Sequence, residues 1–327
     1  MLRSEDGGLT WSVAMNAQVN AVDFVDRTVG WVAGATTEGG HLFHTTNEGR
    51  SWTDEADTIA ESTPLFFDVE ALDRERAVAV GSENGFLHPS DFHRGPPVIV
   101  FTNNAGTAWQ RSTLVGVDRG RFRDSELVSV CLTPSGHGIA TGTDFTASSG
   151  SLVLLTHDAG ATWTIASERF PSVLFAKVAC AGDRDLWIAG GSGTLVHSPD
   201  AGASWRDDTA LLPRDIWPAA ITFQDPLDGW LVADRLVGDS LVTLHTTDGG
   251  QHWTEYEITG TTGLIELTVG VDFDGPNGVI VLQDLHPMSI GRSSFGVTFA
   301  TRDGGETWME TVLPEGINAI WDVSLIR

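Results

Sequence analysis

One short motif recurs seven times along the chain and constrains its fold more than any other feature. The motif reads Ser/Thr-x-Asp/Asn-x-Gly-x-x-Trp, and every copy keeps both the Gly and the Trp. Its Asp or Asn positions are Asp6, Asn47, Asn104, Asp158, Asp200, Asp248 and Asp303. A repeat of this kind overrides a domain count based on length alone. We therefore expect residues 1–327 to form a single repetitive domain.

The residue types in the motif are those of a tight turn between two strands. A short acceptor side chain caps backbone N–H groups across such a loop, and Gly adopts φ > 0 without steric penalty. The Trp that follows opens the next strand and buries its rings against a neighbouring sheet. Strand patterns at 20–25, 30–34, 41–44 and 51–53 surround the second copy. We expect each motif to join the third and fourth strands of a four-stranded sheet, with a structural role for its Asp or Asn.

The spacing of the motif predicts how these sheets are arranged. Consecutive motif tryptophans are 41 to 57 residues apart, the length of one blade of a β-propeller. From Trp308 to Arg327, and on from Met1 to Trp11, there are only 30 residues, so the closing blade falls short by about one strand. We expect residues 317–323 to form its innermost strand and 11–14 its outermost. The predicted fold is an all-β, seven-bladed β-propeller closed by both chain ends, with either three strands in the last blade or a shortened sequence.

The motif and its flanks resemble a known repeat. The seven copies are similar to the BNR or Asp-box repeat, and GWVAG at 30–34 followed by LFHTTNEGRSW at 42–52 resembles the photosystem II stability/assembly-factor type of seven-bladed propeller. This resemblance covers nearly the whole chain and implies a propeller that docks a partner. Asp boxes also occur in sialidases, xyloglucan hydrolases and sortilin-type receptors, so the resemblance specifies architecture more closely than activity.

Composition narrows the classes of function. The chain has 44 acidic and 19 basic residues and a formal net charge of −25, which repels a phosphate backbone. No apolar run is long enough to span a membrane. We therefore expect no nucleic acid partner, no membrane span and no cofactor, and a monomer. The first residues do not resemble a leader, so the protein is either cytoplasmic or, if a leader has been removed, exported to the periplasm or secreted.

Two sets of residues recur at matching places in different blades. Cys131 and Cys180 fall on the first strands of the third and fourth blades, and matching positions point the same way, so we expect two buried thiols rather than a bridge. His44, His197 and His245 each lie three residues before the Asp or Asn of their motif. That equivalence favours a shared role on the strand surface over a catalytic triad.

Candidate binding residues gather in the loops opposite the motif turns, on what we call the loop-rich face. Variable loops on a rigid scaffold are where binding residues concentrate. The candidates for ligand or partner binding are His88, Asp91, His93, Arg94, Arg119, Arg121, Arg123, Trp217, His286 and Arg292. The arginines form a local cationic rim suited to an acidic partner, unless Asp118 and Asp124 simply pair with them in a solvated loop. The histidines have ligand chemistry, but their spacing is no metal signature, so we predict no metal.

Two classes of function follow. The first is a non-catalytic scaffold that docks a protein, or an acidic or carbohydrate ligand, on the loop-rich face. The alternative is an enzyme, either glycoside hydrolase-like or dependent on a metal or histidine, with its site at the axial opening of that face. A sialidase mechanism is disfavoured because it needs a Tyr nucleophile, and the single Tyr, Tyr256, is expected on an outermost strand. The FRIP-type segment of sialidases is incomplete at 169–171, and no other catalytic motif is present, so we favour binding without excluding an enzyme.

Overall fold

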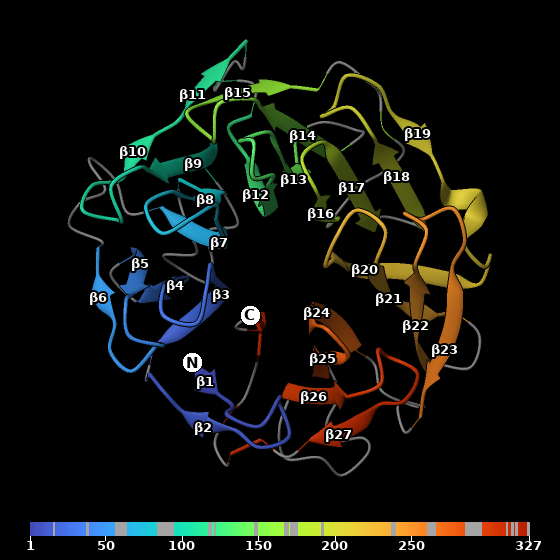
Figure 1. Ribbon diagram of the computed structural model, residues 1–327. Coiled ribbons are helices and arrows are strands. Elements are labelled where there is room, and N and C mark those ends of the chain that lie inside the picture. Colours follow the sequence, from blue (N-terminus) through green and yellow to red (C-terminus); the bar gives the residue numbers. More distant parts are fainter. Residues whose placement is uncertain are drawn as a thin grey trace.

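The computed structural model shows an all-β propeller, in which six antiparallel sheets stand radially around a common axis (Figure 1). The structure describes residues 1–15, 17–36, 39–55, 64–83, 95–116, 120, 122–146, 150–166, 170, 176–190, 193–236, 240–259, 266–284, 296–311, 313–314, 317 and 320–325. The two chain ends lie between the first and the last sheet, where a small two-stranded sheet occupies a seventh position (Figure 1).

The six blades follow one another in chain order, each running from its innermost to its outermost strand. Blade 1 contains β3 (Gln18–Phe24), β4 (Gly30–Thr36), β5 (Gly39–Thr45) and β6 (Thr53–Asp54). Blade 2 contains β7 (Leu65–Ala71), β8 (Ala77–Ser82), β9 (Pro97–Thr102) and β10 (Gln110–Arg111). Blade 3 contains β12 (Ser125–Leu132), β13 (Gly138–Asp144), β14 (Ser151–Thr156) and β15 (Thr162–Ile165).

The remaining blades repeat the same order. Blade 4 contains β16 (Lys177–Ala181), β17 (Asp185–Gly190), β18 (Thr194–Ser198) and β19 (Arg206–Asp207), followed by the short 3-10 helix η2 (Thr209–Leu211). Blade 5 contains β20 (Ile216–Phe223), β21 (Gly229–Arg235), β22 (Ser240–Thr246) and β23 (Thr254–Ile258). Blade 6 contains β24 (Glu266–Asp274), β25 (Asn277–Asp284), β26 (Gly296–Thr301) and β27 (Met309–Thr311).

Blade 3 departs from the predicted four strands because it gains a fifth at its outer edge. β11 (Thr113–Val115), on the connection from blade 2, pairs in parallel with β15. The outer strand of blade 3 is thereby tied to the segment that leaves blade 2.

The motif turns have the predicted geometry. In blade 3 the Thr156 hydroxyl accepts the Gly160 N–H at 3.1 Å, and the Asp158 carboxylate accepts the Thr162 N–H at 2.8 Å. Asn47 replaces the carboxylate in blade 1 and still accepts the Ser51 N–H at 3.0 Å. In these turns the side chains of Asn47 and Asp158 thus cap backbone N–H groups across the loop.

The motif glycine has a second role that its turn alone does not reveal. Gly160 has φ of 89°, and a Cβ atom there would lie 2.4 Å from Val78 Cγ2 on the second strand of blade 2. In blade 5 a Cβ on Gly250 would lie 2.4 Å from Cη2 of Trp187, on the second strand of blade 4. The turn of one blade thus packs directly on the preceding blade, which only a residue without a side chain permits.

The recurring histidines have a shared structural role, as predicted. His197 stacks on Trp187 of its own blade with ring centroids 3.8 Å apart, and His245 stacks on Trp230 at 4.4 Å. His44 stacks on Trp31 in the same way at 4.6 Å. In blades 4 and 5 a Phe from the next blade covers the other side of the same indole, as in the Trp230–Phe273 pair at 3.9 Å. These stacks join neighbouring blades through apolar area.

The prediction of seven blades is borne out in part. At the seventh position β1 (Leu2–Arg3) pairs with β2 (Ser12–Val13), which lies within the predicted outermost strand 11–14. The segment 320–325 lies on the axial side, where the Asp322 carboxylate accepts the Val22 N–H of blade 1 at 3.0 Å. This segment pairs in no ladder among the described residues, so the predicted strand 317–323 is correct in position but not in pairing.

The expectation of two free thiols is wrong, because Cys131 and Cys180 form a disulfide with Cα atoms 5.8 Å apart. Cys131 pairs with Ile139, which pairs with Leu155, three residues before the motif Asp. The same path in blade 4 leads from His197 through Trp187 to Ala179, not to Cys180. Cys180 is therefore offset by one residue, so its side chain points to the opposite side of its strand and meets Cys131.

The disulfide is expected to stabilise the junction between blades 3 and 4. Replacing both residues, Cys131→Ser with Cys180→Ser, should lower the free energy of unfolding by about 4 kcal/mol, since the bond links residues 49 apart. Thermal unfolding of the wild type and the variant, with and without reductant, measures this effect. Reductant should destabilise the wild type to the level of the variant and leave the variant unchanged. A wild type indifferent to reductant would contradict the assignment.

Candidate functional site

Two of the predicted binding residues lie within the described part of the chain. Arg123 is exposed and follows the buried Phe122 at the entrance to blade 3. Trp217 lies near the start of β20 and remains 45% exposed. The other candidates lie outside the described residues: His88, Asp91, His93, Arg94, Arg119, Arg121, His286 and Arg292.

Trp217 lies at a hollow on the loop-rich face, where blade 4 leads into blade 5. The hollow has a volume of about 730 Å³, and its lining includes Leu212, Arg214 and Leu236. Leu236 is 55% exposed and Arg214 is also exposed. Two large apolar side chains and a cation are therefore presented together to solvent.

The floor of this hollow is held by the two blades beneath it. Leu212 and Ile216 are buried in the apolar core that blades 4 and 5 share. The Asp215 carbonyl accepts the Leu236 N–H at 2.8 Å, and the Asp215 carboxylate is paired with Arg235. Trp217 is thus displayed on a firmly packed strand rather than on a free loop, which reduces the entropy lost when a partner binds.

The chemistry of the hollow suits a protein segment. Exposed aromatic side chains in a partly formed pocket are frequent anchors at protein interfaces, and Arg is enriched there as well. The Arg214 guanidinium at the same hollow can pair with a carboxylate of the bound segment. The arrangement therefore supports recognition of an apolar side chain with an acidic group nearby.

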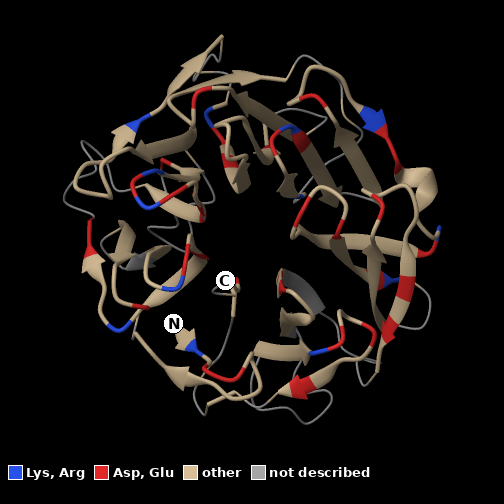
Figure 2. Cartoon of the chain, viewed as in Figure 1, with Lys and Arg blue, Asp and Glu red and all other residues tan. Residues whose placement is uncertain are grey.

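A second group of polar side chains surrounds the axis of the propeller. Acidic residues lie at the inner ends of several blades (Figure 2). The Asp23 carboxylate of blade 1 accepts the Ala71 N–H of blade 2 at 2.7 Å, and Asp68 of blade 2 accepts the Val130 N–H of blade 3 at 2.8 Å. Each of these carboxylates thus ties the innermost strand of one blade to that of the next.

The same arrangement continues at the seventh position. Asp272 of blade 6 accepts the Leu325 N–H at 2.7 Å, and Asp322 then accepts the Val22 N–H of blade 1. Between blades 3 and 4 the Ser129 hydroxyl takes this role and accepts the Val178 N–H at 3.2 Å. We call this set of inter-blade hydrogen bonds the axial belt; its acceptors are Asp23, Asp68, Glu70, Ser129, Asp272 and Asp322.

Burial, and after it neighbouring charges, raises the pKa of several carboxyl groups in the axial belt. Burial raises the pKa of Asp322 to about 8, and the Asp68 carboxylate adds to that rise, while Lys177 opposes it. Burial also raises the pKa of Asp23 to about 6, against the hydrogen bond from the Ala71 N–H. The pKa of Glu70 is raised well above its usual value, chiefly by burial and next by Asp23.

Sequence reasoning missed the axial belt, although a signal for it exists. An acidic residue next to a Val recurs in the innermost strands, as in Val22-Asp23, Asp68-Val69, Val271-Asp272 and Asp322-Val323. The strand registers place Asp23 and Asp272 at one level of the axis and Asp68 two residues nearer the start of its strand. Among so many acidic residues, no single pair stood out by itself.

Three further observations concern the alternative classes of function. Tyr256 lies on β23, the outermost strand of blade 5, as expected. Within the described ranges, no three His, Cys, Asp or Glu side chains converge in a way that could hold a metal ion. No helix in that part of the chain is long and apolar enough to cross a membrane.

The protonation of Asp322 predicts a pH dependence of stability. Its pKa is higher in the folded protein than its ordinary value of 3.8, so the folded state holds a proton that the unfolded chain has lost. The resulting stabilisation is complete at low pH and is lost as pH rises through about 8. We expect the melting temperature of the wild type to fall more steeply between about pH 6 and pH 8.5 than that of Asp322→Asn.

The comparison between variants isolates Asp322 from other groups. Burial lowers the pKa of the Met1 amino group, which gives an opposite slope in the same range but contributes equally to both proteins. The Asn side chain keeps an acceptor for the Val22 N–H. As a control, Asp26→Asn should leave the slope unchanged, because the pKa of Asp26 is lowered to about 2. Equal slopes for the wild type and Asp322→Asn would overturn the assignment.

Comparison with known proteins agrees with this architecture. No protein-family model matches the chain. The photosystem II assembly protein Ycf48 of Synechococcus sp. (strain JA-3-3Ab) is 36% identical over 63 residues, which cover 19% of this chain and 18% of that protein. The alignment therefore spans less than a fifth of that relative's length.

Two solved structures share the fold over most of this chain. The structure titled "YCF48 bound to D1 peptide" matches with a TM-score of 0.58 and 14% identity, over 90% of this chain and 82% of that one. The GH74 xyloglucanase of Xanthomonas campestris matches with a TM-score of 0.62 and 15% identity, over 95% of this chain and 47% of that one. At these identities the matches establish the fold alone. Together with the sequence match, they make the chain a Ycf48-like β-propeller, related to the photosystem II assembly factors by distant homology.

Proposed function

We propose that the chain is a non-catalytic docking propeller that binds a protein segment on its loop-rich face. The observation that carries the proposal is the half-exposed Trp217, set beside Leu236 and Arg214 over a rigid floor. The solved Ycf48 structure of the same fold is bound to a D1 peptide, which supports a peptide or protein as the ligand class. An assembly-factor role would use this docking to hold a partner without chemical change.

The predicted cationic rim belongs to the same proposal. Arg119, Arg121 and Arg123 would add a basic margin to the loop-rich face at the entrance to blade 3. In a chain of net charge −25, a local positive region selects acidic segments and repels the rest of the protein surface. The apolar hollow would then supply affinity, and the rim would orient the partner.

The disulfide is evidence on the cellular compartment of the protein. Disulfides form and persist mainly in oxidising compartments such as the periplasm and the extracellular space. The Cys131–Cys180 bond therefore favours the exported alternative over the cytoplasmic one. We propose that the chain meets its partner outside the cytoplasm.

The fold shared with xyloglucanase does not by itself favour catalysis. This chain corresponds to 47% of that enzyme chain. The axial carboxylates are engaged as acceptors of inter-blade hydrogen bonds. Their positions are explained by the fold without a substrate.

The docking role of Trp217 can be tested with a labelled D1 peptide as the probe. We expect Trp217→Ala to weaken binding at least about tenfold, because loss of a central aromatic anchor removes most of the energy of such an interface. Fluorescence anisotropy measures the affinity. The matched control is Leu227→Ala, which removes another exposed apolar side chain, 58% exposed, from the turn between β20 and β21 on the opposite face. Equal loss in both variants, or no binding by the wild type, would refute the proposal.

The cationic rim has its own test with a hexaglutamate peptide. Charge reversal of Arg119, Arg121 and Arg123 to Glu should weaken binding of this probe at low salt at least about tenfold, because three cations of the rim become three anions. Binding to the wild type should also decline as salt screens the charges. Reversal of the exposed Arg74 and the half-buried Arg76, on the motif side of blade 2, serves as the control and should have no effect. If the two sets of reversals act alike, the rim is not a binding surface.

A further inference from the structure

The entrances to blades 3 and 5 are built in the same way. Their first strands, β12 and β20, each have a register irregularity directly after the third residue. Each strand is also preceded by the dipeptide Arg-Asp, at 123–124 and at 214–215, which precedes no other first strand of the six blades. The irregularity aligns the two strands, so the two dipeptides lie at equivalent places on the loop-rich face.

The same backbone hydrogen bond follows at both entrances. The Asp124 carbonyl accepts the Phe145 N–H at 3.0 Å in blade 3, just as the Asp215 carbonyl accepts the Leu236 N–H in blade 5. Phe145 and Leu236 directly follow the second strands β13 and β21, and they are 40% and 55% exposed. One exposed apolar side chain is ordinary on a protein surface. A matched pair, each beside an Arg-Asp dipeptide, indicates a duplicated surface feature.

The two arginines at these entrances are available to a ligand. Arg123 and Arg214 are exposed, and neither forms an ion pair among the residues that the structure describes. By contrast, Arg206 and Arg235 are each paired with a carboxylate. An unpaired guanidinium group can bind a carboxylate from outside through charge-assisted hydrogen bonds. Each entrance therefore presents a cation beside an exposed apolar side chain.

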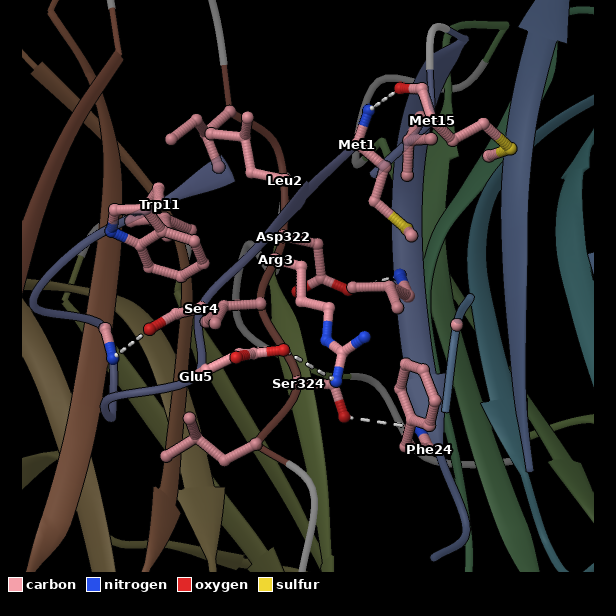
Figure 3. A pocket seen from close by; sticks show the side chains of 18 of the residues that line it. Met1, Leu2, Arg3, Ser4, Glu5, Trp11, Met15, Phe24, Asp322 and Ser324 are labelled. Atoms are coloured by element: carbon pink, nitrogen blue, oxygen red, sulfur yellow. Dashed lines mark hydrogen bonds and ion pairs between the residues drawn. The ribbon is translucent and has the colours of Figure 1, made fainter. Parts of the chain in front are cut away.

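The arginines around a larger hollow, at the seventh position, are different because other groups already engage them. This hollow has a volume of about 1510 Å³. At its wall Arg3 lies 3.3 Å from the Glu5 carboxylate (Figure 3), and Arg302 donates to the Asp6 carbonyl at 3.1 Å. An acidic ligand would have to displace these partners, which makes this hollow a poorer acceptor than the two entrances.

We propose that the entrance to blade 3 is a second docking subsite, and that one extended segment of the partner binds it and the hollow beside Trp217 together. The segment carries two apolar side chains, each with a carboxylate next to it. The inference deepens the proposed docking function, on which it rests, by specifying the partner. In the second subsite Phe145 and Arg123 correspond to Leu236 and Arg214 in the first.

The architecture sets the distance between the two subsites. Blade 4 lies between blades 3 and 5 (Figure 1). Packed sheets lie roughly 10 Å apart, so equivalent points near the axis of blades 3 and 5 are about 20 Å apart. An extended chain advances roughly 3.3 Å per residue, so about six residues span this distance. The apolar residues of the partner segment are therefore expected about six positions apart.

The test uses three labelled peptides of equal length and charge. LDGSGSLD carries two Leu-Asp pairs at the expected spacing, LDGSGSGD lacks the second Leu, and LDGLDSGS has the composition of the first with its pairs only about 10 Å apart. We expect LDGSGSLD to bind the wild type at least about tenfold more tightly than either control, because its second pair binds within the same complex. Fluorescence anisotropy measures the affinities. Equal affinity of LDGSGSLD and either control would overturn the proposal.

Matched variants place the second pair at blade 3. Phe145→Ala should abolish the advantage of LDGSGSLD over LDGSGSGD, whereas Val115→Ala should keep it. Val115 is also exposed, at 51%, but it lies on β11 at the outer edge of the same blade. Arg123→Gln should weaken binding of LDGSGSLD and make it less sensitive to salt, because one charge-assisted contact is lost. If Phe145→Ala and Val115→Ala act alike, or Arg123→Gln has no effect, the second subsite is rejected.

The second subsite and the proposed function fail in different ways. If binding of the D1 peptide depends on Trp217 while LDGSGSLD gains nothing over its controls, the second subsite is rejected and docking at Trp217 remains. If LDGSGSLD keeps its advantage in Trp217→Ala and loses it in Phe145→Ala, the span between the two subsites is rejected. If the D1 peptide does not bind while the results for LDGSGSLD are as expected, the proposed ligand is rejected and the two subsites remain.

Discussion

The contact between motif turns and the blades before them is the constraint on which this propeller depends. The turn has two residues with positive φ, and in four copies a Cβ on the motif Gly would meet the second strand of the preceding blade, at Gly8, Gly160, Gly250 and Gly305. A local hairpin signal therefore encodes a long-range contact. Because this contact recurs in four of the turns, repetition of one small packing unit favours the radial arrangement, and in blades 4 and 5 stacked Trp, His and Phe rings pack beside it.

The spacing of the motif predicted the propeller architecture because the motif encodes both a tight turn and a contact with a neighbouring blade. It failed where the outcome depended on one residue of register. Cys131 and Cys180 occupy similar strands, yet the ladders offset them by one position and turn their side chains toward each other. The fifth strand of blade 3 was missed for a related reason, since β11 is three residues long and carries no motif. Spacing between motifs cannot resolve either feature.

The candidate site was predictable only where an unusual residue marked it. Trp217 stood out as one of two tryptophans outside the repeat, and the structure places it at a hollow on the expected face. The axial belt could not be predicted from the sequence, because acidic residues are frequent throughout this chain. The belt acids are brought together only when the first strands converge at the axis. Convergence at an axis is a property of the assembled ring, so residues 50 or more apart meet there without any local signal, as Asp272 and Leu325 do.

The axial belt also explains how the ring closes around an incomplete blade. Elsewhere a first strand is held by its ladder to the second strand. Among the described residues the segment 320–325 has no such ladder, and side-chain acceptors hold it from both sides, with Asp272 bonding Leu325 and Asp322 bonding Val22. Side-chain hydrogen bonds at the axis thus join the seventh position to both neighbouring blades. Because hydrogen bonds to buried carboxyl groups depend on their protonation, the same acids make this junction sensitive to pH.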